Sequence, residues 1–99
     1  MVKVKVNFYG VLKDSVSEPQ TEVQMPGEFT LRQLLDSLTK RYGDKFQEGI
    51  LDKHSGVKSY IRFFVDREPV DNFELDKQLV IKGESAEAAI LILPTSEGG

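Results

Sequence analysis

The chain of 99 residues contains no cysteine and a single histidine, His54. Without cysteine there is no disulfide, no thiolate nucleophile and no cysteine-based metal site, and one histidine cannot build a multi-histidine site. Any covalent chemistry on this chain must therefore use a group other than a thiol side chain.

Positive charge is also in short supply. The sequence has 13 Lys and Arg residues against 16 Asp and Glu, which gives a formal net charge of −3. Proteins that bind the phosphate backbone carry a clustered excess of Lys and Arg. We therefore expect no nucleic-acid partner.

Long apolar runs are missing as well. No stretch approaches the roughly 20 residues of a membrane span, and the first six residues alternate instead of forming the apolar core of a signal peptide. We expect a cytoplasmic protein that does not bind a membrane. The length and the hydrophobic content of 39% predict one domain over residues 1–99, in which residues 94–99 form a flexible C-terminal tail.

The clearest local pattern is the alternation of residues 2–9, in which Val2, Val4, Val6 and Phe8 share one face. A period of two predicts a strand that is buried on one side. Residues 22–25 alternate more weakly and predict a second strand, which the turn-forming pair at 26–27 ends. The two strands together indicate a hairpin.

A helix is predicted to begin after Thr30. Thr30 as N-cap and Gln33 three residues later form a capping box, and Phe29 and Leu34 occupy the hydrophobic staple positions. Gly43 follows the last apolar residue as a C-cap. The apolar residues between them recur at helical spacing and should pack on a sheet: Leu31, Leu34, Leu35, Leu38 and Tyr42.

The second half of the chain predicts further strands. Residues 60–65 are rich in strand formers, residues 66–69 make a turn, and residues 70–73 begin a short returning strand. Residues 88–93 form the final strand, which Pro94 ends because it lacks an N–H donor. Within residues 44–59 the spacing of Phe46, Ile50 and Leu51 predicts a short second helix. The fold class is α+β, with a mixed sheet and one principal helix packed across one face.

Four segments carry a resemblance to a known family: FYGVLK at 8–13, TLRQLLDSL at 30–38, FVDREPV at 64–70 and ILILPTSEGG at 90–99. In this order the chain resembles the MoaD/ThiS family of sulfur carrier proteins, the prokaryotic relatives of ubiquitin, and most of all MoaD, the small subunit of molybdopterin synthase. The resemblance implies a ubiquitin-like β-grasp fold, with the first and last strands side by side and parallel at the centre of the sheet. The chain departs from the family in GESAE at 83–87, where a Gly-Asp-Glu-Val type turn is usual, and in having Pro94 where a Pro-Pro pair is common.

The resemblance also implies a function. A MoeB/ThiF-type enzyme would use ATP to adenylate the carboxylate of Gly99, next to Gly98, and a sulfur donor protein would convert it to a thiocarboxylate. A MoaE-like large synthase subunit would then take the sulfur for molybdopterin, in the biosynthesis of the molybdenum or tungsten cofactor. The chain itself binds no cofactor in this scheme. The scheme agrees with the residues, since the sequence has no Gly-x-x-x-x-Gly-Lys-Ser/Thr loop for a nucleotide. The carboxylate would therefore have to be activated by a partner.

Strand alternation separates two faces in the second half of the sheet. Ile61, Phe63 and Val65 share one face, and Phe64 points to the other. An open face with Phe64, Leu91 and Leu93 would be a partner-docking patch. The tail residues predicted to bind partners with it are Pro94, Thr95, Ser96 and Glu97. The alternative is that residues 44–59 cover this face and both sets belong to the core.

Two other functions fit the same features. In a ubiquitin-like protein modifier, a lysine amine attacks the activated carboxylate of Gly99. In a sulfur carrier of another pathway, the sulfur serves cysteine or thiamine synthesis. The remaining titratable candidates are interpreted as exposed loop and turn residues, because an acid–base pair needs burial to separate its pKa values. They are His54, the pair Asp14 and Glu18, and the pair Asp66 and Glu68.

Overall fold

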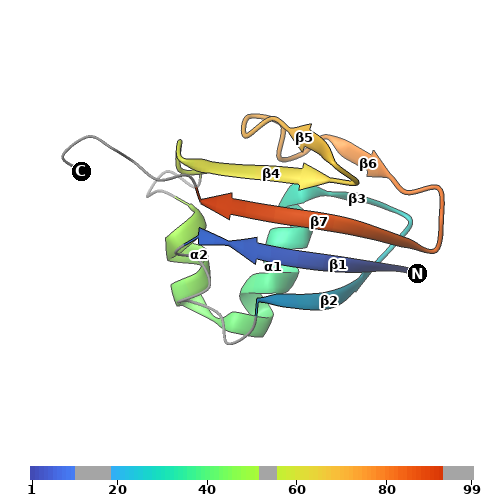
Figure 1. Ribbon diagram of the computed structural model, residues 1–99, viewed down its shortest axis with the longest axis horizontal. Coiled ribbons are helices and arrows are strands. Elements are labelled where there is room, and N and C mark those ends of the chain that lie inside the picture. The colour runs from blue at the N-terminus through green and yellow to red at the C-terminus, as the bar shows by residue number, and fades with distance from the viewer. Residues whose placement is uncertain (11–18, 52–55, 93–99) are drawn as a thin grey trace.

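The computed structural model describes residues 1–10, 19–51 and 56–92. A five-stranded sheet in the order β2-β1-β7-β4-β5 forms one layer, and helix α1 packs across one of its faces (Figure 1). The strands are β1 Val2–Tyr9, β2 Gln20–Met25, β4 Ile61–Val65, β5 Glu68–Val70 and β7 Ser85–Ile92. The predicted α+β class is confirmed.

The first and last strands lie side by side in the middle of this sheet. β1 and β7 run parallel, in register from the pair Lys3 and Ser85 to the pair Tyr9 and Leu91. β2 pairs antiparallel with β1, and β4 pairs antiparallel with β7. The hairpin and the central parallel pair are thus confirmed, although β2 and β7 both begin earlier than the sequence predicted.

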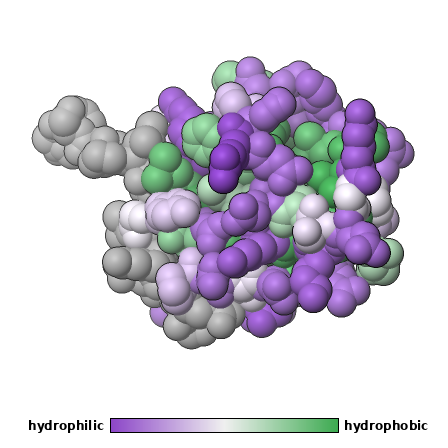
Figure 2. Space-filling view, turned by 45° about the vertical axis from the view of Figure 1, so that its right-hand side comes forward, coloured by the Kyte–Doolittle hydropathy of each residue, from purple (hydrophilic) through white to green (hydrophobic). Residues whose placement is uncertain are grey.

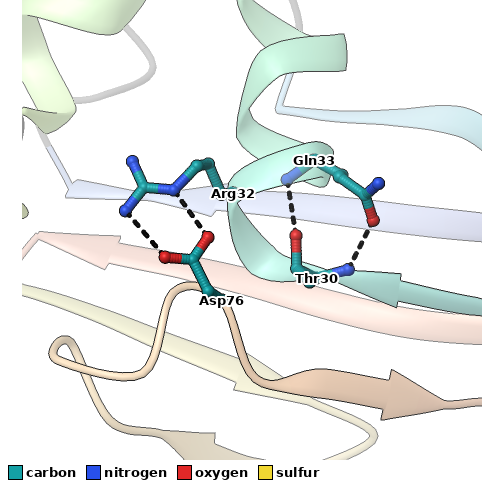
Figure 3. Close-up of polar contacts among 4 residues, drawn as sticks. All are labelled: Thr30, Arg32, Gln33 and Asp76. Atoms are coloured by element: carbon teal, nitrogen blue, oxygen red, sulfur yellow. Dashed lines mark hydrogen bonds and ion pairs between the residues drawn. The ribbon is translucent and has the colours of Figure 1, made fainter.

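Helix α1 (Leu31–Tyr42) begins and ends where the sequence predicted. The Thr30 Oγ1 accepts the N–H of Gln33 at 3.1 Å, and the Thr30 N–H donates to Gln33 Oε1 at 2.8 Å (Figure 3). At the other end Gly43 has a φ of 93°, which favours glycine, and its N–H donates to the carbonyl of Thr39 at 2.7 Å. Both ends are therefore specified by local hydrogen bonds.

The hydrophobic core lies between α1 and the inner face of the sheet. The even-numbered residues of β1 are all buried there, opposite the four leucines of α1. From the other strands it includes Met25, Ile61, Phe63, Val65, Ala86, Ala88 and Ile90. Since burial alternates along β1 and β4, the opposite side chains of the sheet point away from this core.

The predicted second helix is α2 (Asp44–Ile50), and its Phe46 and Ile50 are fully buried. Leu51 lies just beyond the helix and forms a bridge with Val57. Phe46 packs against the inward-facing Phe8, with ring centroids 6.1 Å apart. α2 therefore covers the same side of the sheet as α1, so this part of residues 44–59 does not cover the outer face.

Two expectations for the remaining strands fail. The sequence did not predict β3 (Glu28–Thr30), which pairs with β6 (Gln78–Val80) in a separate two-stranded sheet, because three residues are too few to show a period. The returning strand is β5 and not residues 70–73, because its turn contains only residues 66 and 67. Beyond β5, the Asn72 Nδ2 donates to the carbonyl of Ile61 at 2.8 Å, which draws the chain away from the ladder.

The loop between β5 and β6 is fastened to the start of α1. The guanidinium of Arg32 contacts both carboxylate oxygens of Asp76, with its Nε at 2.8 Å from Oδ1 and its Nη2 at 3.3 Å from Oδ2 (Figure 3). The backbone N–H of Arg32 also donates to the carbonyl of Leu75 at 3.0 Å.

Within the described ranges, no helix is long and apolar enough to cross a membrane.

Candidate docking face and chain exit

The outer face of the sheet carries the side chains that point away from α1. On β1 these are the odd-numbered residues, and on β4 they are Arg62 and Phe64. On β7 they are the partners of the odd-numbered β1 residues in the parallel register: Ser85, Glu87, Ala89 and Leu91.

Four of these residues form a compact group, which we call the outer-face patch: Tyr9, Phe64, Ala89 and Leu91. Ala89 pairs with Phe64, and Leu91 pairs with Tyr9. Phe64 and Leu91 are thus diagonal neighbours, within reach of each other across two strands. Both are half-buried, whereas Tyr9 is 49% exposed. The structure brings the predicted residues Phe64 and Leu91 to one face, as the strand alternation indicated.

A depression of about 450 Å³ opens on this face. Its lining combines the apolar side chains of Tyr9, Phe64 and Ala89 with two charged residues, Arg67 and Glu87. Ala89 lies between Phe64 and Asn7 in the sheet register, and its small side chain leaves the space open. The depression can therefore receive an apolar group that has a polar end.

The turn at the rim of the depression is held firmly. Asp66 and Arg67 join β4 to β5 with φ values of 51° and 71°, the left-handed conformation of a two-residue hairpin turn. The Asp66 N–H donates to the carbonyl of Glu87 at 2.7 Å, and the Asp66 Oδ1 accepts the N–H of Glu87 at 3.0 Å. These two bonds fix the turn to β7.

Sequence reasoning missed two residues of this face. Tyr9 was visible as the last outward position of the alternating first strand, where a large ring extends the patch that Phe64 and Leu91 define. Arg67 had a signal too, because it occupies the turn position that usually holds glycine. Asp66 and Glu68, predicted as turn acids, are both exposed.

Strand β7 ends beside the outer-face patch. β7 ends at Ile92, which pairs with Ile61 at the start of β4, and Leu91 before it lies between Tyr9 and Arg62. The rest of the predicted site follows along the chain and lies outside the described residues: Leu93, Pro94, Thr95, Ser96, Glu97, Gly98 and Gly99. His54, Asp14 and Glu18 lie outside them as well.

The coloured part of the face drawn in Figure 2 is mostly polar. In Figure 2 the hydrophobic residues form separate patches among hydrophilic ones. Among the residues that the structure describes, no three His, Cys, Asp or Glu side chains are grouped so as to hold a metal ion.

No family model matches the chain, and no curated protein matches its sequence. Solved structures do match its fold. The small archaeal modifier protein 1 of Haloferax volcanii superposes with a TM-score of 0.78 at 13% identity, over 95% of this chain and 100% of that one. The fold is that of the ubiquitin-like β-grasp proteins.

Two other β-grasp structures match at similar length. The putative molybdopterin converting factor subunit 1 of Pyrococcus furiosus has a TM-score of 0.70 and 20% identity, over 95% of this chain and 100% of that one. A chain of the Amycolatopsis orientalis BexX/CysO complex has the same TM-score and identity, over 95% and 99%. The predicted β-grasp arrangement is therefore confirmed over almost the whole chain.

Proposed function

We propose that this protein is a sulfur carrier that donates sulfur in molybdopterin biosynthesis from a thiocarboxylate on Gly99. The observation that carries the proposal is the end-to-end match of the β-grasp fold to a chain named as a molybdopterin converting factor subunit. The sequence supports it as well, because Gly98 and Gly99 follow within seven residues of Ile92, the last described residue of β7. Glycines without side chains suit entry into a narrow active site.

The chemistry needs two partners before the acceptor. A carboxylate oxygen of Gly99 attacks the α-phosphorus of ATP on a MoeB/ThiF-type enzyme, and pyrophosphate leaves. A sulfide-level nucleophile from a sulfur donor protein then attacks the acyl carbon, and the bond to AMP breaks with AMP taking the electron pair. The product is the thiocarboxylate, which a MoaE-like large synthase subunit receives. ATP belongs to the activating enzyme, since this sequence has no phosphate-binding loop.

The outer-face patch supports this scheme. The Gly99 carboxylate has to enter the active sites of successive partners. A docking surface close to the point where residues 93–99 begin would let the binding energy of docking position them in each partner. Leu91 and Tyr9 lie at the end of the sheet from which residues 93–99 continue, and Phe64 lies diagonally beside Leu91. Leu93, Pro94, Thr95, Ser96 and Glu97 would extend the contact into the partner.

Deleting Gly99 tests the proposal. We expect the truncated chain to lose adenylation and sulfur transfer while keeping the thermal unfolding midpoint of the full chain, because every core residue that the structure describes lies before residue 91. The measurements are pyrophosphate release with the purified adenylating enzyme and calorimetry of both chains. A second variant has one alanine appended after Gly99, so that both glycines are kept but the terminal carboxylate no longer belongs to Gly99. It should block activation as well. Sulfur transfer by the truncated chain would contradict the proposal.

A second candidate is a protein modifier, which the match to small archaeal modifier protein 1 favours. The activated Gly99 is the same, but a lysine amine attacks it and an isopeptide bond forms. Mass spectrometry of the protein isolated from cells distinguishes the two functions. A sulfur-for-oxygen increment on the intact chain indicates the carrier, and Gly-Gly remnants on lysines of other proteins indicate the modifier. Reconstitution with each candidate acceptor separates molybdopterin from cysteine or thiamine synthesis.

A further inference from the structure

The Asp66-Arg67 turn does not use the residues that its backbone favours. Both positions have positive φ, and a two-residue hairpin of this kind prefers Asn-Gly or Asp-Gly. Asp66 meets the preference at the first position. Arg67 occupies the second position with a φ of 71°. At this φ the Cβ of an L residue clashes with the backbone, and glycine avoids the clash because it has no Cβ. The sequence therefore tolerates strain at Arg67 that a single substitution would remove.

The place of Arg67 suggests why. Arg67 lines the depression on the outer face together with Tyr9 and Phe64. The two hydrogen bonds between Asp66 and Glu87 prevent the turn from swinging away from the sheet. Backbone strain that persists at a fixed position next to a binding surface is typical of functional residues.

The charge of Arg67 is not neutralised within the described part of the chain. The ion pairs there join Arg32 to Asp76 and Lys77 to Glu74, and the side chain of Arg67 has no such contact. An unpaired guanidinium beside an apolar patch is a ready partner for a carboxylate, which its planar fork can bind through two parallel hydrogen bonds.

Arg67 decides the sign of the net charge on the outer face. The cations Lys3, Lys5 and Arg62 on this face are matched by the anions Glu22, Asp66 and Glu87 on it and at its rim, so that Arg67 is the cation in excess. The chain as a whole has a net charge of −3. Arg67 thus gives this face one net positive charge, which favours an acidic partner group at the position of its guanidinium.

We propose that Arg67 is a specificity-determining residue, which binds an aspartate or glutamate side chain of the adenylating enzyme when that enzyme docks on the depression. Apolar groups around that carboxylate would cover Tyr9 and Phe64. The strained turn is retained because it holds the guanidinium in place before docking, which lowers the entropic cost of the contact. This inference rests on the proposed function and names the chemistry by which its docking face is recognised.

The test combines stability with adenylation kinetics on full-length protein. Arg67→Gly removes both the strain and the charge, Arg67→Asn removes the charge with a residue that tolerates positive φ, and Arg67→Lys keeps the charge without the fork. Lys82→Asn is the control, because it removes one exposed positive charge from outside the depression. The readouts are the thermal midpoint, and KM and kcat for the carrier with the purified MoeB/ThiF-type enzyme.

Arg67→Gly should raise the thermal midpoint and yet increase the KM for the carrier by about tenfold or more, with kcat unchanged. Arg67→Asn should give the same increase in KM, Arg67→Lys a smaller one, and the control a change of less than about twofold.

Three results overturn the inference. An unchanged KM for Arg67→Gly means that Arg67 does not contact the enzyme, and the proposed function stands if wild type is adenylated normally. A lowered thermal midpoint for Arg67→Gly means that Arg67 serves the fold, for instance by pairing with Glu87. Absence of adenylation in wild type removes the proposed function and this inference with it.

Discussion

Two phenylalanines only ten residues apart show how position decides what a side chain contributes. Phe63 is buried beneath α1 on the inner face of β4, whereas Phe73 is 96% exposed in the loop after β5. The sequence predicted the burial of Phe63 from strand alternation. It placed Phe73 in a returning strand, because the hydrogen bond from Asn72 to Ile61 that turns the chain aside leaves no periodic signal.

We expect Phe63→Ala to lower the free energy of unfolding by about 3–5 kcal/mol, because the lost ring leaves a cavity in the core. Phe73→Ala, the matched control, should change it by less than about 0.5 kcal/mol. Urea unfolding of both variants measures the difference. If Phe73→Ala destabilised the fold by as much as Phe63→Ala, the exposed loop position described above would be wrong.

At the scale of elements, those with local signals were predicted well and those defined by tertiary contacts were not. The capping box of Thr30 and Gln33 and the C-cap at Gly43 placed α1 correctly, since their hydrogen bonds join residues near in sequence. β3 was missed because its three residues become a strand only by pairing with β6, some fifty residues later in the chain. The outer-face patch was predicted in part, as alternation alone assigned Phe64 and Leu91 to one face.

The contact between α1 and the loop before β6 should depend on pH. The hydrogen bonds to Arg32 hold the pKa of Asp76 below its ordinary value, and those to Asp76 raise the pKa of Arg32. Because the pKa of Asp76 is lower in the folded chain, its ion pair stabilises the fold at pH above the ordinary range of a carboxyl, about 3.9. This contribution is lost as the pH falls through the lowered folded-state value.

The variant Asp76→Asn measures this contribution. The stability difference from wild type should be small, because the side chains of Arg32 and Asp76 are both exposed. It should be constant near neutral pH and should shrink as the pH falls below about 4. Added salt should shrink it as well. Glu48→Gln in α2 is the control for removal of an exposed carboxylate. A difference that grew on acidification would contradict the assigned direction of the pKa shift.

At the scale of the whole molecule, the parallel pair of β1 and β7 joins the two ends of the fold. Residues 2–9 and 85–92 come together only when almost the entire chain is folded, so no local pattern could reveal the pairing. The resemblance to the sulfur carriers supplied it. The same pairing places Leu91, near the end of β7, next to Tyr9, which is how a distant strand becomes part of the candidate site.

This central position predicts where the fold is most stable. The backbone of β7 is hydrogen-bonded on both sides, to β1 and to β4, whereas β5 lies at an edge. We expect the amides of Ala88 and Ile90 to exchange with solvent only through global unfolding, and those of β5 through local opening at lower free energy. Hydrogen exchange followed by NMR, with increasing denaturant, measures both.

A chain ending at Ile92 is the control for a contribution from residues 93–99. Its β7 amides should exchange as slowly as those of the full chain, because this chain keeps all of β7 and every core residue that the structure describes. If β7 opened as readily as β5 in the full chain, the central parallel pair would not be the most stable part of the sheet. Slow exchange in both chains would instead show that β7 stays folded whether or not residues 93–99 are present.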